Sequence, residues 1–309
     1  MKTATSNPVH VGSNRDGFIV VAVLWILGAL SVLISTYAIY VVETMPGFVV
    51  HENRLRTEAL TSAAIELTAY RQLATPQASR PRGDRFSFRL DNANVAVEFR
   101  SETSRIDLNS APKQLLTGLF LALGARSDAA EFYSDRIVAW RTPPQAGQTD
   151  ASAGGPGAGS PPRQTSFPHT GELLQVPDLP AALVERALPF VTVYSGRQAV
   201  NVLDAAPEVI AALPGMTPDR VKAVLTYRQA SPDDMQALLP LLGAAQQFTT
   251  TEGSQALRVN TRIAFDNGHQ SRAEAVILLF DEGSEPYSVL SWQDGASRPF
   301  VESSWKGLR

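Results

Sequence analysis

The sequence predicts an α+β protein with an N-terminal transmembrane helix, a helix packed on an antiparallel sheet, and a large inserted all-α domain. Three observations lead to this prediction. An uncharged apolar run covers 18–42, alternating apolar and polar residues indicate strands in 76–104 and 256–309, and the region 105–255 between them has helical patterns. Because the strands flank the helical region on both sides, we interpret that region as an insertion between them.

Composition allows a substantial core. The 309 residues suggest about two domains, and 44% are hydrophobic while 18% are charged, which excludes a mainly disordered chain. The formal net charge is -3, from 27 basic and 30 acidic residues, which argues against a protein that mainly neutralises phosphates. No cysteine is present, so zinc fingers, iron–sulfur clusters, disulfides and cysteine nucleophiles are excluded.

No enzyme motif stands out in the chain. The sequence lacks the zinc-binding H-E-x-x-H pair, the G-x-S-x-G elbow, the P-loop and a G-x-G-x-x-G loop after a strand. Its four histidines are far apart, at His10, His51, His169 and His269. We therefore predict no catalytic residues, and we expect that the protein is not an enzyme.

The apolar run is long enough to span a bilayer. Phe18 to Val42 contains 25 residues without a charge, which as a helix measures about 37 Å. A secretory signal peptide has a shorter apolar core, so this run is better explained as a transmembrane helix. Lys2 and Arg15 precede it against Asp16, and this slight positive excess predicts a cytoplasmic N-terminus with the large domain on the other side.

Beyond the membrane segment, 43–75 is predicted to continue as an amphipathic helix. Apolar residues recur at helical spacing from Leu55 to Tyr70, with charged residues on the other face. Pro46-Gly47 is expected to kink or loosen this helix, and Pro76 is expected to end it. The strands that follow, 86–90 and 95–99, enclose the turn 91–94, and strands return near 257–265, 273–280 and 287–292.

The inserted region contains a diverged repeat. Residues 107–113 read DLNSAPK and residues 202–208 read VLDAAPE. Asn109 and Asp204 are predicted to cap the helices that follow, because Asn and Asp favour the N-cap position and proline is tolerated in a first helical turn. We predict a helix–turn–helix after the second copy and another over 172–190. Residues 142–166 are rich in Pro, Gly, Ala and Ser, which predicts a flexible loop.

These paired helices resemble helix-hairpin-helix or SAM-like units. Helix-hairpin-helix units can bind DNA phosphates through backbone amides in the turn. Charges within 197–229 amount to a net of only one positive charge, which favours a structural or protein-contact role. A membrane-anchored helix-hairpin-helix protein for DNA binding or uptake remains the alternative function.

The start of the chain resembles the prepilin-peptidase site of type IV pilins and pseudopilins. A polar leader, 1–17, ends in Arg15-Asp16-Gly17, and Phe18 then opens the apolar helix. The resemblance implies cleavage after Gly17 and N-methylation of Phe18. The alternative is an ordinary single-pass anchor in which a glycine happens to precede a phenylalanine.

Ala22 departs from the usual pattern of that family. Most members have Glu at the fifth mature position, where it pairs with the N-terminal amine of the neighbouring subunit. A carboxylate inside a bilayer costs about 2.5–3.5 kcal/mol on insertion scales, so it is kept only where it finds a partner. A subunit that enters the fibre first has no earlier subunit to dock on, and Ala22 therefore predicts a tip subunit.

In combination, these features resemble the general secretion pathway protein K family, the large minor pseudopilins of the type II secretion system. The RDGF site, LNSAP, LDAAP, SFPHTGELLQVPDLP and PFVTVY are the segments that match. The resemblance implies a pilin-like α+β fold with an inserted helical domain. It also implies a non-catalytic subunit that primes and caps the pseudopilus tip for export of folded proteins across the outer membrane.

The same resemblance implies location and partners. The expected partners are minor pseudopilins I and J, other pseudopilins and the prepilin peptidase, with the secretin and secreted exoproteins as further candidates. The expected location is the inner membrane of a Gram-negative bacterium, with the C-terminal domain in the periplasm, and no nucleic acid is expected to bind.

Some members of this family hold calcium in acidic loops after a tryptophan-containing helix. Here the corresponding segment, SDRIVAWR, is followed by a loop in which Asp150 is the single carboxylate. Calcium takes six to eight oxygen ligands, several from carboxylates. We therefore predict no metal site and no cofactor.

Overall fold

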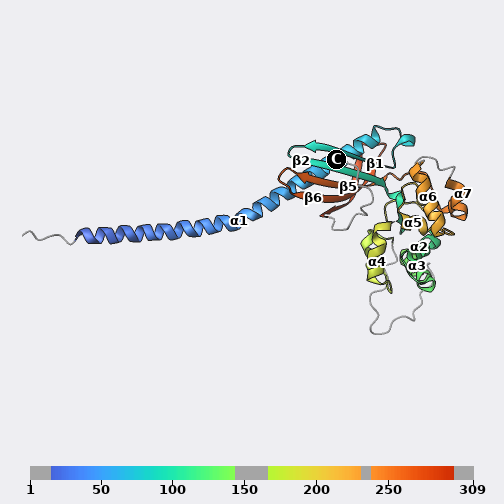
Figure 1. The fold of residues 1–309 in the computed structure, drawn as a ribbon, viewed down its shortest axis with the longest axis horizontal. Coiled ribbons are helices and arrows are strands. Elements are labelled where there is room, and N and C mark those ends of the chain that lie inside the picture. Colours follow the sequence, from blue (N-terminus) through green and yellow to red (C-terminus); the bar gives the residue numbers. More distant parts are fainter. Residues whose placement is uncertain (1–14, 143–165, 231–237, 296–309) are drawn as a thin grey trace, which may run out of the picture. The chain divides into compact units, whose positions relative to one another are not determined.

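The computed structural model describes residues 15–142, 166–230 and 238–295 of the chain. The chain divides between Ala59 and Leu60 into two compact units. Helix α1 (Arg15–Leu73) begins in the first unit and ends in the second (Figure 1). Its backbone is helical across Pro46 and Gly47, so these residues do not end the helix, and it stops three residues before Pro76, as the sequence predicts.

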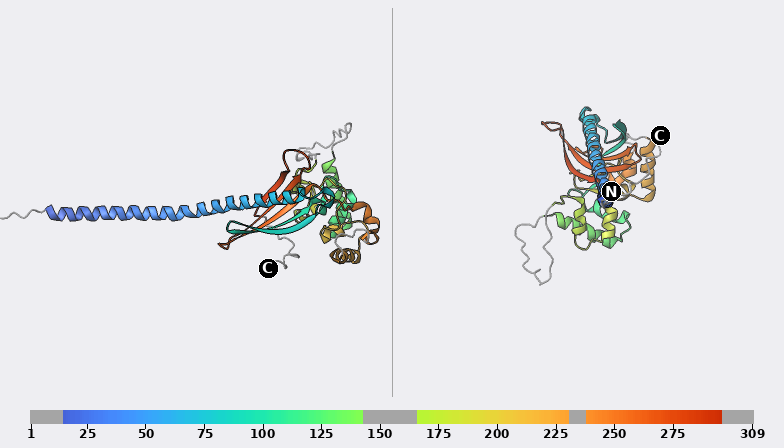
Figure 2. Two further views of the ribbon diagram at one scale, coloured as in Figure 1. Left: turned by 90° about the horizontal axis from the view of Figure 1, so that it is seen from above. Right: turned by 90° about the vertical axis from the view of Figure 1, so that its left-hand side faces the viewer.

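The second unit contains, over its described residues, a five-stranded antiparallel sheet with the strand order β1-β2-β5-β6-β7. Figure 2 shows these strands lying side by side. The strands are β1 (Gly83–Leu90), β2 (Ala93–Ser101), β5 (Ala256–Phe265), β6 (Gln270–Leu279) and β7 (Tyr287–Asp294). The strands predicted from alternation are confirmed, and each is slightly longer than the apolar residues alone indicate.

The last turns of α1 pack on one face of this sheet. Leu60, Ala64, Ile65 and Ala69 form a buried core with the apolar side chains of the strands, among them Phe99. Small residues at positions 64 and 69 let the helix lie close to the strands. One strand face is therefore covered by α1, as predicted for a helix on a sheet.

Two turns show why the hairpins form where they do. β1 and β2 are joined by Asp91 and Asn92, with Leu90 paired to Ala93. Asp91 has φ 53°, in the left-handed region that Asp and Asn tolerate better than other side chains. The β5–β6 turn contains Gly268 with φ 83°, where the absence of a Cβ removes the strain.

Between β2 and β5 the chain forms mainly helices. They are α2 (Lys113–Ala122), α3 (Ser127–Arg141), α4 (Ala181–Ala187), α5 (Pro207–Ala211), α6 (Pro218–Ala230) and α7 (Leu239–Leu242). Short 3₁₀ helices cover Glu102–Ser104, Thr170–Gln175, Leu188–Phe190 and Gly243–Phe248, and one more, Gln77–Ser79, precedes the sheet. These helices surround a core of their own, separate from the core under the sheet.

This region differs from an all-α domain in one respect. Strand β3 (Ile106–Asp107) pairs in parallel with β4 (Val191–Thr192), so a small parallel sheet lies among the helices. Two-residue strands are too short to produce a recognisable alternation in the sequence. The part of the prediction that described the insertion as all-α is therefore wrong at these residues.

The predicted helix–turn–helix after the second repeat is confirmed, since α5 and α6 flank a turn in which Gly215 has φ 75°. The one predicted over 172–190 is instead a 3₁₀ helix followed by α4. Pro177 and Pro180 lack the backbone N–H that a continuing helix needs, and Asp178 between them has φ 67°. The predicted loop 142–166 lies almost wholly outside the described residues.

Candidate functional site

The apolar part of α1 is the first functional feature. Ile19–Tyr40 contains 22 residues with a mean hydropathy of 2.5, and none of this segment is buried against other parts of the protein that the structure describes. Trp25 is 77% exposed and Tyr37 69%. At 1.5 Å per residue the segment measures about 33 Å, which matches the hydrocarbon thickness of a bilayer. The chain is therefore a membrane-anchored protein by the length and composition of this helix.

Hydroxyl groups inside the segment bond within the helix. Ser31 Oγ donates to the Leu27 carbonyl at 2.8 Å, and Thr36 Oγ1 donates to the Val32 carbonyl at 2.6 Å. In lipid, no water satisfies such groups, so local bonds to the helix backbone make them compatible with a membrane.

The residues predicted for processing lie at the start of this helix. α1 begins at Arg15, so Gly17 and Phe18 belong to its first turn. The Phe18 side chain lies outside the part of the chain that the structure describes, as do residues 1–14 of the leader. Cleavage after Gly17 and methylation of Phe18 therefore stay predictions. Ala22 is described and is partly exposed on the helix.

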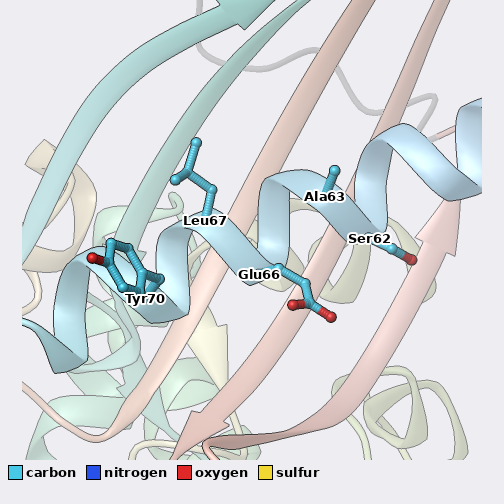
Figure 3. Close-up of a pocket in the computed structure, with 5 residues that line it drawn as sticks. All are labelled: Ser62, Ala63, Glu66, Leu67 and Tyr70. Carbon is cyan, nitrogen blue, oxygen red and sulfur yellow. The ribbon is translucent and has the colours of Figure 1, made fainter. Parts of the chain in front are cut away.

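The side of α1 that faces away from the sheet carries a second feature. In the second unit, Ser62, Glu66 and Tyr70 are exposed, and Ala63 and Leu67 are half-buried between them (Figure 3). Tyr70 is 71% exposed. These five residues line a shallow depression along the helix. Small residues flanked by Leu67 and Tyr70 give a surface on which another helix can pack.

A buried carboxylate joins the sheet to the helical region. Glu102, in the 3₁₀ helix after β2, is 0% exposed. Arg258 of β5 binds it with two nitrogens, Nε to Oε1 at 2.7 Å and Nη2 to Oε2 at 3.0 Å. Thr192 of β4 donates its hydroxyl to the same carboxylate, and Arg258 also contacts Glu274 of β6. One carboxylate and one guanidinium therefore connect four elements.

The charges in this cluster shift one another's pKa. Burial alone would raise the pKa of Glu102, but the charge and hydrogen bonds of Arg258, with help from Arg105 and Thr192, hold it below 4.5. The pKa of Arg105 is also lowered, to about 10, because burial and the neighbouring positive charge of Arg258 disfavour its charged form. Glu102 is therefore ionised at neutral pH and is well compensated.

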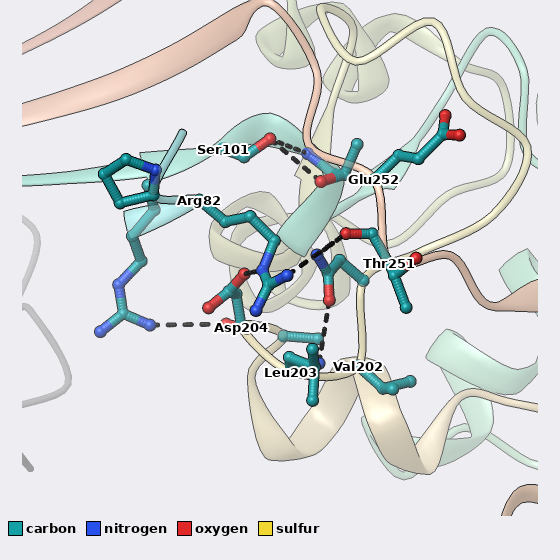
Figure 4. Close-up of polar contacts among 12 residues, drawn as sticks. Arg82, Ser101, Val202, Leu203, Asp204, Thr251 and Glu252 are labelled. Atoms are coloured by element: carbon teal, nitrogen blue, oxygen red, sulfur yellow. Dashed lines mark hydrogen bonds and ion pairs between the residues drawn. The ribbon is translucent and has the colours of Figure 1, made fainter. Parts of the chain in front are cut away.

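A second carboxylate joins the same two regions less tightly. Asp204 lies in the loop before α5, and its Oδ2 is 3.3 Å from Arg82 Nε just before β1 (Figure 4). Arg100 of β2 donates to the backbone carbonyl of Asp204 at 3.4 Å rather than to its carboxylate. Burial raises the pKa of Asp204, and the positive charges of Arg82, Arg100 and Arg228 only partly offset it.

Hydrogen bonds between uncharged groups lie near the Asp204–Arg82 ion pair, where the chain leaves the sheet after β2 and returns to it before β5. Ser101 Oγ accepts a hydrogen bond from the Ser254 backbone N–H at 2.8 Å. Asn201 donates to the Thr251 carbonyl at 3.4 Å and accepts from Leu203 N–H at 3.0 Å. Figure 4 draws Ser101, Leu203 and Thr251 in the same view as Asp204.

The predicted helix caps are wrong at both positions. The N-cap residues of α2 and α5 are Pro112 and Ala206, and neither provides a side-chain cap. Asn109 instead exchanges two hydrogen bonds with the backbone of Phe167, at 2.7 and 3.0 Å. Asp204 contacts the sheet through Arg82, as described above. Both residues lie too far before their helices for the side chain to reach the free N–H groups.

Asp107, two residues before Asn109, was missed by sequence reasoning. Its Oδ1 accepts from the N–H groups of Asn109 and Ser110, at 2.8 and 3.0 Å. Its Oδ2 accepts from the Ser195 hydroxyl at 3.0 Å and from Gly196 N–H at 2.8 Å. The side chain thus organises the loop before α2 and connects it to the residues after β4.

The two copies of the repeat, 107–113 and 202–208, are each bound by an arginine that donates to two of their backbone carbonyls. Arg141, at the end of α3, donates to the carbonyls of Leu108 and Ala111 at 2.7 and 2.6 Å. Arg228 in α6 donates to the carbonyls of Val202 and Ala205 at 3.2 and 2.5 Å. The signal was present in the sequence, since each arginine follows an aromatic residue in a helix that comes after a repeat.

Within 15–142, 166–230 and 238–295, no three or more His, Asp or Glu side chains gather where they could hold a metal ion. Asp150 lies outside these residues, so the prediction of no calcium site is not tested here. We call the contact between the sheet and the helical region, made by Glu102 with Arg258 and by Asp204 with Arg82, the junction. The ion pairs of the junction hold these two parts of the protein together.

The fold and the anchor define the class of protein: a membrane-anchored α+β protein in which a helical region lies between the second and third strands of an antiparallel sheet. More particularly, residues 90–196 match the family model described as type II secretion system (T2SS), protein K. The resemblance predicted from the sequence is confirmed over this region. A comparison with curated proteins gives no match.

A solved structure has the same fold. It is a chain in the crystal structure of the GspK-GspI-GspJ complex from the type 2 secretion system of enterotoxigenic Escherichia coli, with a TM-score of 0.58 and 17% identity. The similarity covers 80% of this chain and 98% of that one. At this identity the likeness shows a shared fold.

Proposed function

We propose that this chain is a minor pseudopilin of a type II secretion system. In this role it is a non-catalytic subunit, anchored in the inner membrane of a Gram-negative bacterium with its C-terminal domain in the periplasm. It primes and caps the pseudopilus, together with minor pseudopilins I and J. The observation that carries the proposal is the match of residues 90–196 to T2SS protein K, in a chain that also has the apolar helix.

The structural features support this role in two ways. The apolar helix provides the membrane anchor from which a pseudopilin is drawn into a fibre. The shallow depression along α1 between Ser62 and Tyr70 provides a helical surface on which a neighbouring subunit could pack (Figure 3). The similarity to a chain of a GspK-GspI-GspJ complex supports pseudopilins I and J as those neighbours.

Processing of the N-terminus tests the proposal most directly. A peptidase that cleaves after Gly17 must approach the backbone closely, which a residue without a Cβ permits. We expect mass spectrometry of the membrane-extracted protein to find Phe18, methylated, as the first residue, and Gly17→Leu to leave the leader attached. A mature protein that begins elsewhere would contradict the assignment, whereas a Gly28→Leu control inside the helix should be processed normally.

Ala22 tests the position of the subunit in the fibre. Ala22→Glu places a carboxylate about one turn into the bilayer, near the side where partial solvation reduces its cost. A tip subunit has no earlier subunit whose amine could pair with this charge, so we expect secretion to stay unchanged or to fall modestly, and fibres to be no longer. Immunogold labelling that finds many copies along the wild-type shaft would contradict the tip position.

A further inference from the structure

The two edge strands of the five-stranded sheet differ in charge. β1 forms one edge and β7 the other, and no strand that the structure describes pairs with the outer side of either. β1 carries Asp84, Arg85 and Arg89, and charged side chains discourage an edge strand from pairing with a further strand. β7 contains no Lys or Arg, and its protection is a bulge at Leu290, which has no partner on β6. β7 is therefore the less protected edge.

Two large apolar residues in the middle of β7 are exposed. Val289 is 43% exposed and Leu290 38%. Val289 pairs with Ile277 of β6, and Ile277 is buried in the core between the sheet and α1. Val289 thus lies at the margin of that core. Covering Val289 and Leu290 would remove apolar surface from water, which favours binding of an apolar segment along this edge.

The backbone at the end of β7 has the conformation that a reversal of the chain needs. Gly295 follows Asp294, the last residue of β7, and has φ 64°. Its N–H still donates to the Arg272 carbonyl of β6 at 2.8 Å. A type II′ turn, which is common in two-residue hairpins, has a glycine with positive φ at its first central position. Gly295 suits that position, and β6 already occupies the inner side of β7, so a hairpin here would place the next residues on the outer side.

The sequence after β7 matches the exposed apolar residues within it. Leu290 and Val289 come five and six residues before Gly295. Phe300 and Val301 come five and six residues after it. A chain that reverses at Gly295 therefore brings the two apolar pairs next to each other, and the bulge shifts this register by one residue at most.

We propose that residues 296–309, which lie outside the described residues, bind to the outer side of β7 as a further antiparallel strand, with Phe300 and Val301 covering its exposed apolar residues. The segment has 14 residues and β7 has 8, so it is long enough for a turn and a strand of that length. Pro299 is compatible with an edge strand, where one side of the backbone needs no N–H. This inference goes beyond the proposed function, because it concerns the C-terminal segment and not the anchor or the family match.

The segment of the same chain is favoured over a strand from another molecule because it is attached directly to this edge. A group held near its site by a short connection has an effective concentration on the order of millimolar, without any further contact. A separate molecule would have to reach that concentration in solution. The chain therefore supplies its own occupant for the outer side of β7.

Disulfide cross-linking of the full-length protein in detergent tests this proposal, because the chain has no cysteine of its own. Opposite residues of antiparallel strands have Cα atoms about 4.5–5.5 Å apart, within the range of a disulfide. Val289→Cys is combined with Phe300→Cys, Val301→Cys or Glu302→Cys, and with Leu308→Cys as the control. We expect the fastest of the first three pairs to form an intramolecular disulfide at least about tenfold faster than the control pair.

Hydrogen exchange in the full-length protein gives a second measurement that needs no cysteine. Phe300→Asp/Val301→Asp places charges against the apolar residues of β7, so the amides of β7 should exchange at least about tenfold faster than in the wild type. Exchange in β1 should not change. The control Gly307→Asp/Leu308→Asp adds the same charge beyond the paired part of the segment and should leave exchange in β7 as in the wild type.

Three results would overturn the proposal. The first is equal cross-linking of Val289→Cys with every position in the segment, Leu308→Cys included, which would mean that the segment does not bind in one register. The second is a disulfide-linked dimer in place of the intramolecular disulfide, which would assign the edge to a second copy of the chain. The third is unchanged exchange in β7 in Phe300→Asp/Val301→Asp.

Discussion

Two carboxylates connect the sheet to the helical region, and they do so under different conditions. Glu102 is fully buried, receives two bonds from Arg258 and one from Thr192, and has a lowered pKa. Asp204 is partly buried, lies 3.3 Å from one nitrogen of Arg82, and has a raised pKa. Burial disfavours both charges, so the number and geometry of the bonds to each carboxylate decide whether it stabilises the junction.

Removing the charge of Glu102 should have the largest effect. Glu102→Gln leaves Arg258 buried with only Glu274 to compensate it, and breaking a buried ion pair costs about 3–5 kcal/mol. We expect the midpoint of thermal unfolding of the full-length protein in detergent to fall by about 10 °C. Glu185→Gln, an exposed change on α4, is the matched control and should leave the midpoint unchanged. A drop of the same size in both variants would argue against the role of the pair.

Acid should reduce the contribution of Glu102 to the free energy of unfolding. Because its pKa in the folded protein lies below the ordinary 4.5, its contribution to stability is present above pH 4.5 and is lost as the pH falls through the folded pKa. The difference in unfolding free energy between the wild type and Glu102→Gln should therefore be constant near neutral pH and shrink below 4.5. A difference that grows with acidification would contradict this assignment.

Removing the charge of Asp204 should change the unfolding midpoint only slightly, and in the opposite direction from Glu102→Gln. Since its folded pKa lies above 3.8, its ionised form is disfavoured by folding, and the associated stability is present at low pH and lost as the pH rises through the folded pKa. Asp204→Asn should thus leave the midpoint at neutral pH unchanged or raise it slightly. Thermal unfolding at neutral pH measures this directly, and a loss as large as that of Glu102→Gln would show that Arg82 compensates Asp204 fully.

The sheet could be predicted from the sequence because its signals are local. Val95, Val97 and Phe99 alternate with polar residues, and Asp91 and Gly268 supply the turns between strands. The continuation of the apolar helix to the residues before Pro76 is equally local, since it depends on spacing and on one helix-breaking residue.

The junction could not be predicted in the same way. Glu98 and Arg258 occupy alternate strand positions that predict a solvated face, but Glu98 is buried beneath Arg85 and Arg100, and Arg258 is bound by Glu102. Glu102 and Arg258 are separated by 156 residues, and no local pattern brings them together. The predicted N-caps were wrong for a related reason. Asn109 and Asp204 are residue types that favour the N-cap position, but they bind Phe167 and Arg82 instead, and no local pattern predicts these partners.

The points where the chain leaves and re-enters the sheet have a consequence for how such a protein can change in length. Ser101 ends β2, and Leu257 beside it belongs to β5, so the two ends of the helical region are already neighbours. The cost of closing a flexible loop grows slowly with its length, by about 0.6 kcal/mol for each doubling. We therefore expect changes of length in the loops between the helices, away from Glu102 and Asp204, to have little effect on strand pairing, so the helical region can differ in size while the sheet stays constant.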